Sequence, residues 1–176
     1  MSLLNLPTVE NATGDVKKIF DEIQSIFGMV PNGIRQWSIN PRALQAQWNS
    51  IKIVLSKDPE DQKLYTMIRY LVSDENSCTY CTGMNAAALI NMFEVSQDEL
   101  VQLQKDPASA NLNEKHKAML LFAIQSVKDA DSVTDKDVEK LKFLGATEIE
   151  IFDVVHAASN MLVINTLFKT FKVQKD

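Results

Sequence analysis

Stripes of apolar residues at helical spacing run along most of this chain, and each stripe is preceded by a residue that favours a helix start. In residues 15–28, Val16, Phe20 and Ile23 fall on one helical face, and Gly28 is a typical stop signal. Residues typical of the position before a helix precede the later stripes: Asn40, Asp58, Ser96, Asn113, Thr134 and Thr147. No segment alternates convincingly with a period of two residues, so the pattern predicts an all-α fold of about eight helices.

We expect a single domain over residues 1–176. It would comprise a helical lead-in over 12–57, a cysteine-containing core over 58–105, and C-terminal helices over 111–172. The last helix, predicted over roughly 147–172, is apolar almost all round, as Phe152, Leu162 and Phe168 illustrate. Such a helix lies in a core or in an interface between subunits, which favours a homo-oligomer.

Composition excludes several classes of function. The 176 residues are 45% hydrophobic and 23% charged, with a net charge of −5 and no basic patch, so we expect no nucleic-acid partner. No run of 18 apolar residues is present and the N-terminus does not resemble a signal peptide, so we expect no membrane partner and a cytoplasmic location. Nothing in the sequence indicates a cofactor or a metal.

Both cysteines of the chain lie in one short stretch, 76-NSCTYCTGMN-85. With Asn76 or Ser77 as the N-cap, Cys78 falls in the first turn of a helix, and Cys78, Cys81 and Asn85 share one face. The positive potential of a helix start stabilises a thiolate. A disulfide across three residues closes so short a loop that it adds little stability, so reversible dithiol chemistry is its more plausible use.

Two other readings of the cysteine pair are open. Buried free cysteines are common core residues, and two of them can fall at this spacing by chance. A zinc site needs three or four ligands, and the two histidines, His116 and His156, are far from the cysteines in sequence.

The stretch around the cysteines, preceded by the helical pattern 60-EDQKLYTMIRYLVS-73, resembles the core of the alkylhydroperoxidase D-like (AhpD-like) proteins of the carboxymuconolactone decarboxylase family. The family pattern there is close to N-x-C-x-Y-C-x-x-x-H. The segment 13-TGDVKKIFDEIQSIFGMVPNG-33 is similar to the lead-in of the longer members, so the resemblance covers about residues 12–105.

The resemblance implies an all-helical fold that assembles as dimers, trimers or hexamers, with a thiol-dependent peroxidase activity. A small peroxide would be the substrate and an external thiol the reductant. By position, Cys81 would attack the peroxide and Cys78 would resolve the product. The histidine and glutamate that relay protons in the family are replaced by Asn85 and Thr66, neither of which takes up a proton. The residues alone favour Cys78, nearer the helix start, as the more acidic thiol.

The sequence therefore predicts catalytic roles for Cys78, Cys81 and Asn85 in a peroxidase or dithiol redox protein weakened by loss of the relay. A non-catalytic redox sensor or oligomeric scaffold, and a decarboxylase of a small lactone acid, are the alternatives. We further expect His116 and Glu75 at the surface and His156 in a core or interface. Three methionines at helical spacing are expected in the core: Met84, Met92 and Met119.

Overall fold

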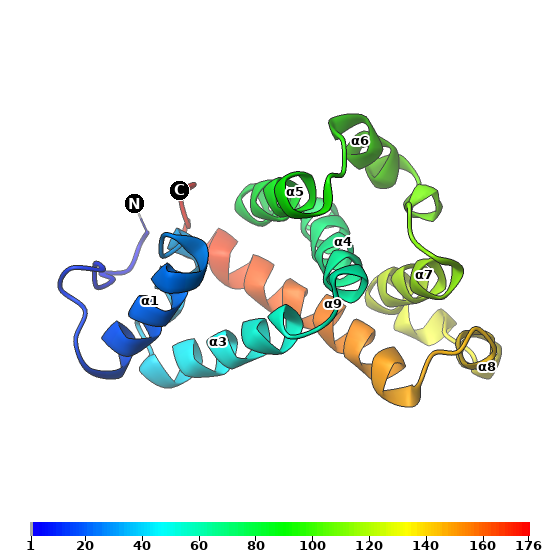
Figure 1. Ribbon diagram of the computed structural model, residues 1–176, viewed down its shortest axis with the longest axis horizontal. Coiled ribbons are helices and arrows are strands. Elements are labelled where there is room, and N and C mark those ends of the chain that lie inside the picture. Colours follow the sequence, from blue (N-terminus) through cyan, green and yellow to red (C-terminus); the bar gives the residue numbers. More distant parts are fainter. Residues whose placement is uncertain (1) are drawn as a thin grey trace. The chain divides into compact units, whose positions relative to one another are not determined.

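The computed structural model describes residues 2–176, and the secondary structure within that range is entirely helical (Figure 1). The all-α prediction is therefore confirmed. Nine α-helices occur among these residues, with two short 3-10 helices, η1 and η2. Their bounds are α1 Gly14–Phe27, α2 Asn32–Trp37, α3 Pro41–Leu55, α4 Pro59–Glu75, α5 Thr79–Phe93, α6 Gln97–Lys105, η1 Pro107–Ser109, α7 Glu114–Lys128, η2 Ala130–Ser132, α8 Asp135–Phe143 and α9 Glu148–Thr170.

Side-chain caps fix where most of these helices begin, as the sequence predicts. Asn40 accepts hydrogen bonds from two backbone N–H groups at the start of α3, and Asp58 accepts one at the start of α4. Ser96 and Glu99 form a capping box at α6. These side chains satisfy N–H groups that have no partner inside the helix.

The chain divides into two compact units, of which the first comprises residues 2–56 and 166–176. Its core is built from α1, α2 and α3 around Phe20, Ile23, Leu44 and Trp48. The short helix α2 contains Gly33 and follows Pro31, two residue types that commonly mark turns. Pro31 is instead the N-cap of α2, a position where the missing N–H of proline costs nothing.

The second unit, residues 57–165, contains the cysteines. In Figure 1 its helix α4 lies between α5 and α7 and contacts both. The core includes Leu64, Ile68, Leu89, Leu120 and Val154.

The prediction that three methionines fill this core is correct for one of them. Met119 is buried, but Met84 and Met92 are exposed. Helical spacing places them on faces of α5 that no helix of the unit covers.

Helix α9 is long and apolar, and about a third of its most apolar 18-residue window is buried. By length and composition alone such a helix is able to cross a membrane, but the core helix of a soluble protein has the same properties. Within the second unit it is tied to α4 by buried polar contacts described below, an arrangement consistent with a soluble protein. Its exposed apolar side chains, Ile149, Phe152 and Val163, fit the subunit interface that the sequence predicts, which stays a prediction.

Candidate functional site

The turn between α4 and α5 brings the first cysteine back against the end of α4. The Asn76 side chain donates to the carbonyl of Val72 at 2.8 Å. Ser77 adopts a left-handed conformation with φ of 52°, and the Cys78 N–H donates to the carbonyl of Ser73 at 2.9 Å. Left-handed backbone is uncommon for a serine and marks a tightly constrained turn.

Cys78 is itself the N-cap of α5, which begins at Thr79. The sequence had placed the cap at Asn76 or Ser77 and Cys78 inside the first turn. That expectation is wrong because Asn76 ends α4 and Ser77 forms the turn. The Cys78 side chain therefore lies at the very start of the helix, where N–H groups lack partners within the helix.

The two cysteines are free thiols in contact with each other. Cys78 is 2% exposed and Cys81 is 1% exposed. A hydrogen bond to Cys78, burial and the negative charge of a Cys78 thiolate all raise the pKa of the Cys81 thiol well above its ordinary value. Burial and the neighbouring sulfur thus both favour the neutral thiol at Cys81. Burial also means that an oxidant reaches the sulfurs only when the surrounding side chains move.

Asn85 lies on the same face of α5 and is buried. Its amide donates to the carbonyl of Cys81 at 2.8 Å, four residues back in its own helix. Thr66 is also buried, and its hydroxyl donates to the carbonyl of Gln62 at 2.7 Å. Both positions of the expected proton relay thus hold neutral side chains bonded to backbone, which neither accept nor release a proton at ordinary pH.

A buried polar pair beneath the thiol turn was missed by the sequence reasoning. Ser73, fully buried, donates its hydroxyl hydrogen to Oδ1 of Asn165 at 3.2 Å, and Asn165 donates to the carbonyl of Val72 at 3.4 Å. The same Ser73 carbonyl accepts the Cys78 N–H. The signal was an asparagine within the apolar stretch of the last helix, because a buried amide needs a partner.

The structure corrects the expected burial of the two histidines, although a subunit interface at His156 stays a prediction. His116 is buried, with Nε2 3.2 Å from Asp61 and Nδ1 3.2 Å from the Asn113 amide, so the surface prediction is wrong. His156 is exposed and stacks on Phe152 with ring centroids 6.0 Å apart, so the core reading is wrong for the isolated chain. His116 thus has a carboxylate partner, Asp61, at the start of α4, which its neighbours in the sequence did not reveal.

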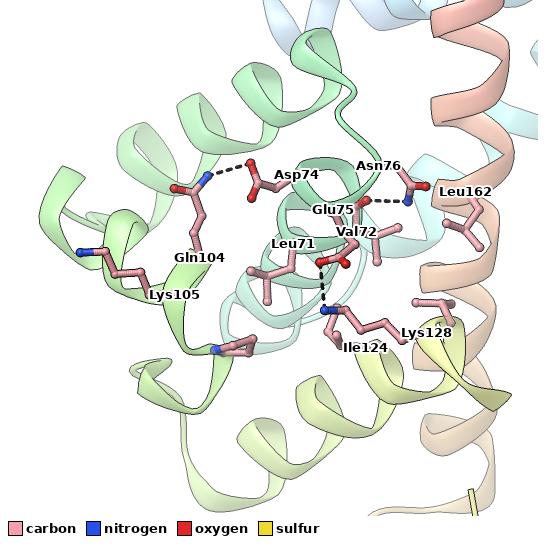
Figure 2. A pocket seen from close by; sticks show the side chains of 12 residues that line it. Leu71, Val72, Asp74, Glu75, Asn76, Gln104, Lys105, Ile124, Lys128 and Leu162 are labelled. Carbon is pink, nitrogen blue, oxygen red and sulfur yellow. Dashed lines mark hydrogen bonds and ion pairs between the residues drawn. The ribbon is translucent and has the colours of Figure 1, made fainter. Parts of the chain in front are cut away.

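A cavity of about 440 Å³ opens beside the thiol turn (Figure 2). Its wall includes Leu71 and Leu162, and its rim carries the Asp74–Gln104 hydrogen bond at 2.8 Å and the Glu75–Lys128 ion pair at 2.9 Å. Glu75 is thus a surface residue, as expected. Asn76 lines the cavity two residues before Cys78, whereas neither cysteine does. Over residues 2–176, no group of three or more histidine, cysteine or acidic side chains is arranged to hold a metal ion.

The sequence matches no protein-family model and no curated protein, whereas the structure resembles several solved ones. Two uncharacterized peroxidase-related proteins, one from Silicibacter sp. TM1040 and one, described as an alkylhydroperoxidase AhpD core, from Ralstonia eutropha JMP134, each superpose with a TM-score of 0.83 at 22% identity. Each alignment covers 99% of this chain and 92% of the other.

The debrominase Bmp8 superposes with a TM-score of 0.73 at 19% identity in its apo form, covering 99% of this chain and 92% of that one. A cysteine-to-alanine variant of Bmp8 in complex with 2,3,4-tribromopyrrole gives 0.72 at 18% identity, covering 100% and 94%. These identities are too low to carry an activity, but the superpositions extend over nearly the whole of each chain. The protein therefore has the all-α fold of the AhpD-like proteins.

Proposed function

We propose that this protein is a thiol-dependent peroxidase in which Cys78 and Cys81 cycle between dithiol and disulfide. The observation that carries the proposal is the pair of free, hydrogen-bonded thiols at the start of α5. Proximity of this kind suits attack by one sulfur and resolution by the other, and the helix start favours the thiolate form.

The position of Cys78 at the start of α5 favours it as the attacking thiolate, which is the reverse of the order implied by the resemblance. The Cys78 thiolate attacks the terminal oxygen of a hydroperoxide, the O–O bond breaks, and an alcohol leaves once its oxygen is protonated. Cys78 is then a sulfenic acid. The Cys81 sulfur attacks it, a disulfide forms and water leaves. An external dithiol reduces the disulfide and is itself oxidised.

We expect this cycle to be slow compared with that of a peroxidase possessing a complete proton relay. A positioned general acid or base typically contributes about 10²–10⁴-fold, and Asn85 and Thr66 provide neither. Burial of both sulfurs adds the cost of a local opening before each encounter with peroxide.

The test is peroxide consumption with an excess of a small dithiol, such as dithiothreitol, as reductant. Wild-type protein should consume peroxide at a rate proportional to its concentration, and the double variant Cys78→Ser/Cys81→Ser should not exceed the uncatalysed rate. Equal rates for the two proteins would refute the proposal. Disulfide formation in the wild type without repeated turnover would instead identify a redox sensor.

Reductive debromination of a small bromoaromatic is a second candidate, favoured by the likeness to the debrominase Bmp8. The dithiol would supply the two electrons: the Cys78 sulfur takes the bromine, the aromatic carbon takes a proton, and Cys81 displaces bromide as the disulfide forms. Bromide release from 2,3,4-tribromopyrrole with dithiothreitol distinguishes this candidate. Release that requires both cysteines, with no peroxide consumption, would favour it over the peroxidase.

A further inference from the structure

The exposed side of helix α9 carries a regular series of uncharged residues. Between residues 149 and 163, the exposed positions of the helix hold Ile149, Phe152, His156, Ser159 and Val163. We call these five residues the α9 seam. Their spacing alternates between three and four residues, so at about 100° per residue they fall within an arc of roughly 80°. This spacing is typical of a helix that packs lengthwise against another helix.

The opposite side of α9 already has its partners. Ile151, Val154, Ala158 and Met161 are buried in the second unit. One apolar side is enough for a helix at the surface of a soluble domain, and the other side normally carries charged and polar residues. The packing of this unit therefore accounts for the buried side of α9 and leaves the apolar residues of the seam without a role.

No acidic or strongly basic side chain interrupts the α9 seam, although 23% of the residues of the chain are charged. The two acidic residues within its span lie beside it and are paired elsewhere, Glu150 with Lys115 at 2.7 Å and Asp153 with Lys57 at 3.5 Å. Within the seam, the rings of Phe152 and His156 stack with an angle of 6° between their planes. A partner that covers the seam thus meets stacked rings and aliphatic groups, and desolvates no carboxylate or ammonium group.

The apolar patch around the α9 seam is large enough for a stable interface. Phe152 is 69% exposed, Ile149 is 73% exposed and Val163 is 53% exposed. Phe143, which is 89% exposed, ends α8 next to the start of α9, where an ion pair joins the two helices (Figure 1). Together these four side chains expose roughly 450 Å². A homodimer interface of standard size buries about 800 Å² on each subunit, of which about 65% is apolar, so the two areas are similar.

A membrane surface does not match the α9 seam. Helices that lie on membranes carry Lys and Arg beside their apolar face, and anionic lipids attract these cations. No exposed position of α9 between residues 148 and 163 is Lys or Arg, and the chain has a net charge of −5. A protein partner is therefore the better match.

The order of residues along the α9 seam makes it complementary to itself. The large side chains of Ile149 and Phe152 lie toward its N-terminal end, and the smaller Ser159 and Val163 lie toward its C-terminal end. In an antiparallel pair of copies, the large side chains of each seam meet the small ones of the other, which fills the space between the helices. A parallel pair would bring two exposed Glu148 carboxylates together and leave a gap between two serines.

We propose that the protein forms a two-fold homodimer in which the α9 seams of two copies pack antiparallel, with the axis near His156. Ile149 then faces Val163 of the partner subunit, since each lies seven residues from the axis, and Phe152 lies close to Ser159 of the partner subunit. The dimer does not depend on the proposed redox chemistry of the thiols. It also identifies an interface, which the family resemblance does not.

The mass of the full chain in solution tests this interface. By light scattering after size-exclusion chromatography, the wild-type protein should have twice the 19.8 kDa mass of one chain. Phe152→Asp should weaken dimerisation about 100-fold or more, because it places a carboxylate in the interface, and should give the mass of one chain. Phe152→Leu should stay dimeric. The control Met92→Glu changes a residue that is 57% exposed on α5 and should also stay dimeric.

Circular dichroism should show the same helix content in all four proteins, so that a loss of mass reports the interface and not unfolding. A wild-type mass of one or three chains, or a dimer that persists in Phe152→Asp, would overturn the proposal. Co-sedimentation with vesicles of phosphatidylcholine and phosphatidylglycerol addresses the membrane. Binding of a monomeric wild-type protein that is lost in Phe152→Asp would assign the seam to a lipid surface and would also overturn the dimer.

Cross-linking tests the orientation of the two copies. In the Cys78→Ser/Cys81→Ser protein, a short bis-maleimide should link His156→Cys to itself, because packed helices lie about 8–10 Å apart. Ile149→Cys alone should not be linked, since antiparallel packing separates its two copies by about 21 Å along the helix axis. Ile149→Cys co-expressed with Val163→Cys should be linked. Efficient linking of Ile149→Cys to itself would show parallel packing and overturn the proposed arrangement.

Discussion

The start of α4 and the thiol turn beyond its end differ in how their buried groups are paired. At the start of α4, charged side chains pair across helices: Asp61 pairs with His116, and Lys115 of α7 pairs with Glu150 of α9. This network ties together the starts of three helices. Its titratable groups are satisfied by the fold, and nothing in their geometry calls for a ligand.

Beyond the C-terminal end, the buried thiols of Cys78 and Cys81 are hydrogen-bonded to each other. No cation is among the groups that act on the Cys81 thiol, and its pKa is raised. The comparison teaches that burial of a titratable side chain does not by itself indicate function. His116 with its Asp61 partner links two helices, whereas two buried thiols side by side are the groups to which we assign chemistry.

The order of attack by the cysteines gives the largest expected effect. Cys78→Ser should slow the first reaction with peroxide by at least about 100-fold, because it removes the thiolate at the helix start. Cys81→Ser should retain that reaction and stop at the sulfenic acid, which dimedone traps and mass spectrometry detects. The opposite pattern would restore the order implied by the family resemblance, in which Cys81 is the attacking thiolate.

A proton acceptor introduced beside the thiols, at position 85, should accelerate peroxide turnover. We expect Asn85→His to raise the peroxidase rate about 10-fold or more, with the gain appearing as pH rises through the ordinary histidine pKa of about 6.5. Asn85→Gln is the matched control, since glutamine fills similar space without taking up a proton. A histidine variant no faster than the glutamine variant would show that access, and not proton transfer, limits the rate.

At the start of α4, where charges are paired across helices, removal of one charge should change the free energy of unfolding and leave peroxide turnover unaffected. Burial raises the Glu150 pKa, but hydrogen bonds from Lys115 and Thr147 outweigh it and hold the pKa at about 2, below its ordinary value of 4.5. Glu150→Gln should therefore lower the free energy of unfolding by roughly 1–3 kcal/mol at neutral pH.

The loss of stability caused by Glu150→Gln should depend on pH. The carboxylate contributes its full stabilisation above pH 4.5, and the contribution is lost as pH falls toward 2. Urea unfolding of wild-type and Glu150→Gln protein from about pH 7 to about pH 2.5 should show the difference shrink. The control Glu148→Gln, at an exposed glutamate of the same helix, should change little. A constant difference across the range would assign the loss to the capping hydrogen bonds alone.

The smallest effect is expected for the exposed ion pair beside the cavity of Figure 2. Lys128 and Glu75 retain 49% and 61% of their side-chain exposure, so Lys128→Gln should change the free energy of unfolding by less than about 0.5 kcal/mol. Peroxide turnover should be unaffected. A large loss of turnover would indicate that the cavity takes part in the reaction.

Local signals in the sequence predicted the helices and the position of the thiol pair. Capping residues such as Asn40 and Asp58 act within one turn, and their effect is confirmed. The helix α2 was not predicted, because proline and glycine also end helices and their effect depends on the backbone conformation around them. The attack order, the role of Asn85 and the oligomeric state stay predictions.

Sequence alone determined that the chain is helical and that two thiols lie at one helix start, because both follow from spacing over a few residues. The tertiary structure decided which polar groups are paired. His116 and Asp61 are 55 positions apart in the sequence, and Ser73 and Asn165 are 92 apart. Electrostatic pairing is set by distance in space, which short sequence patterns do not encode.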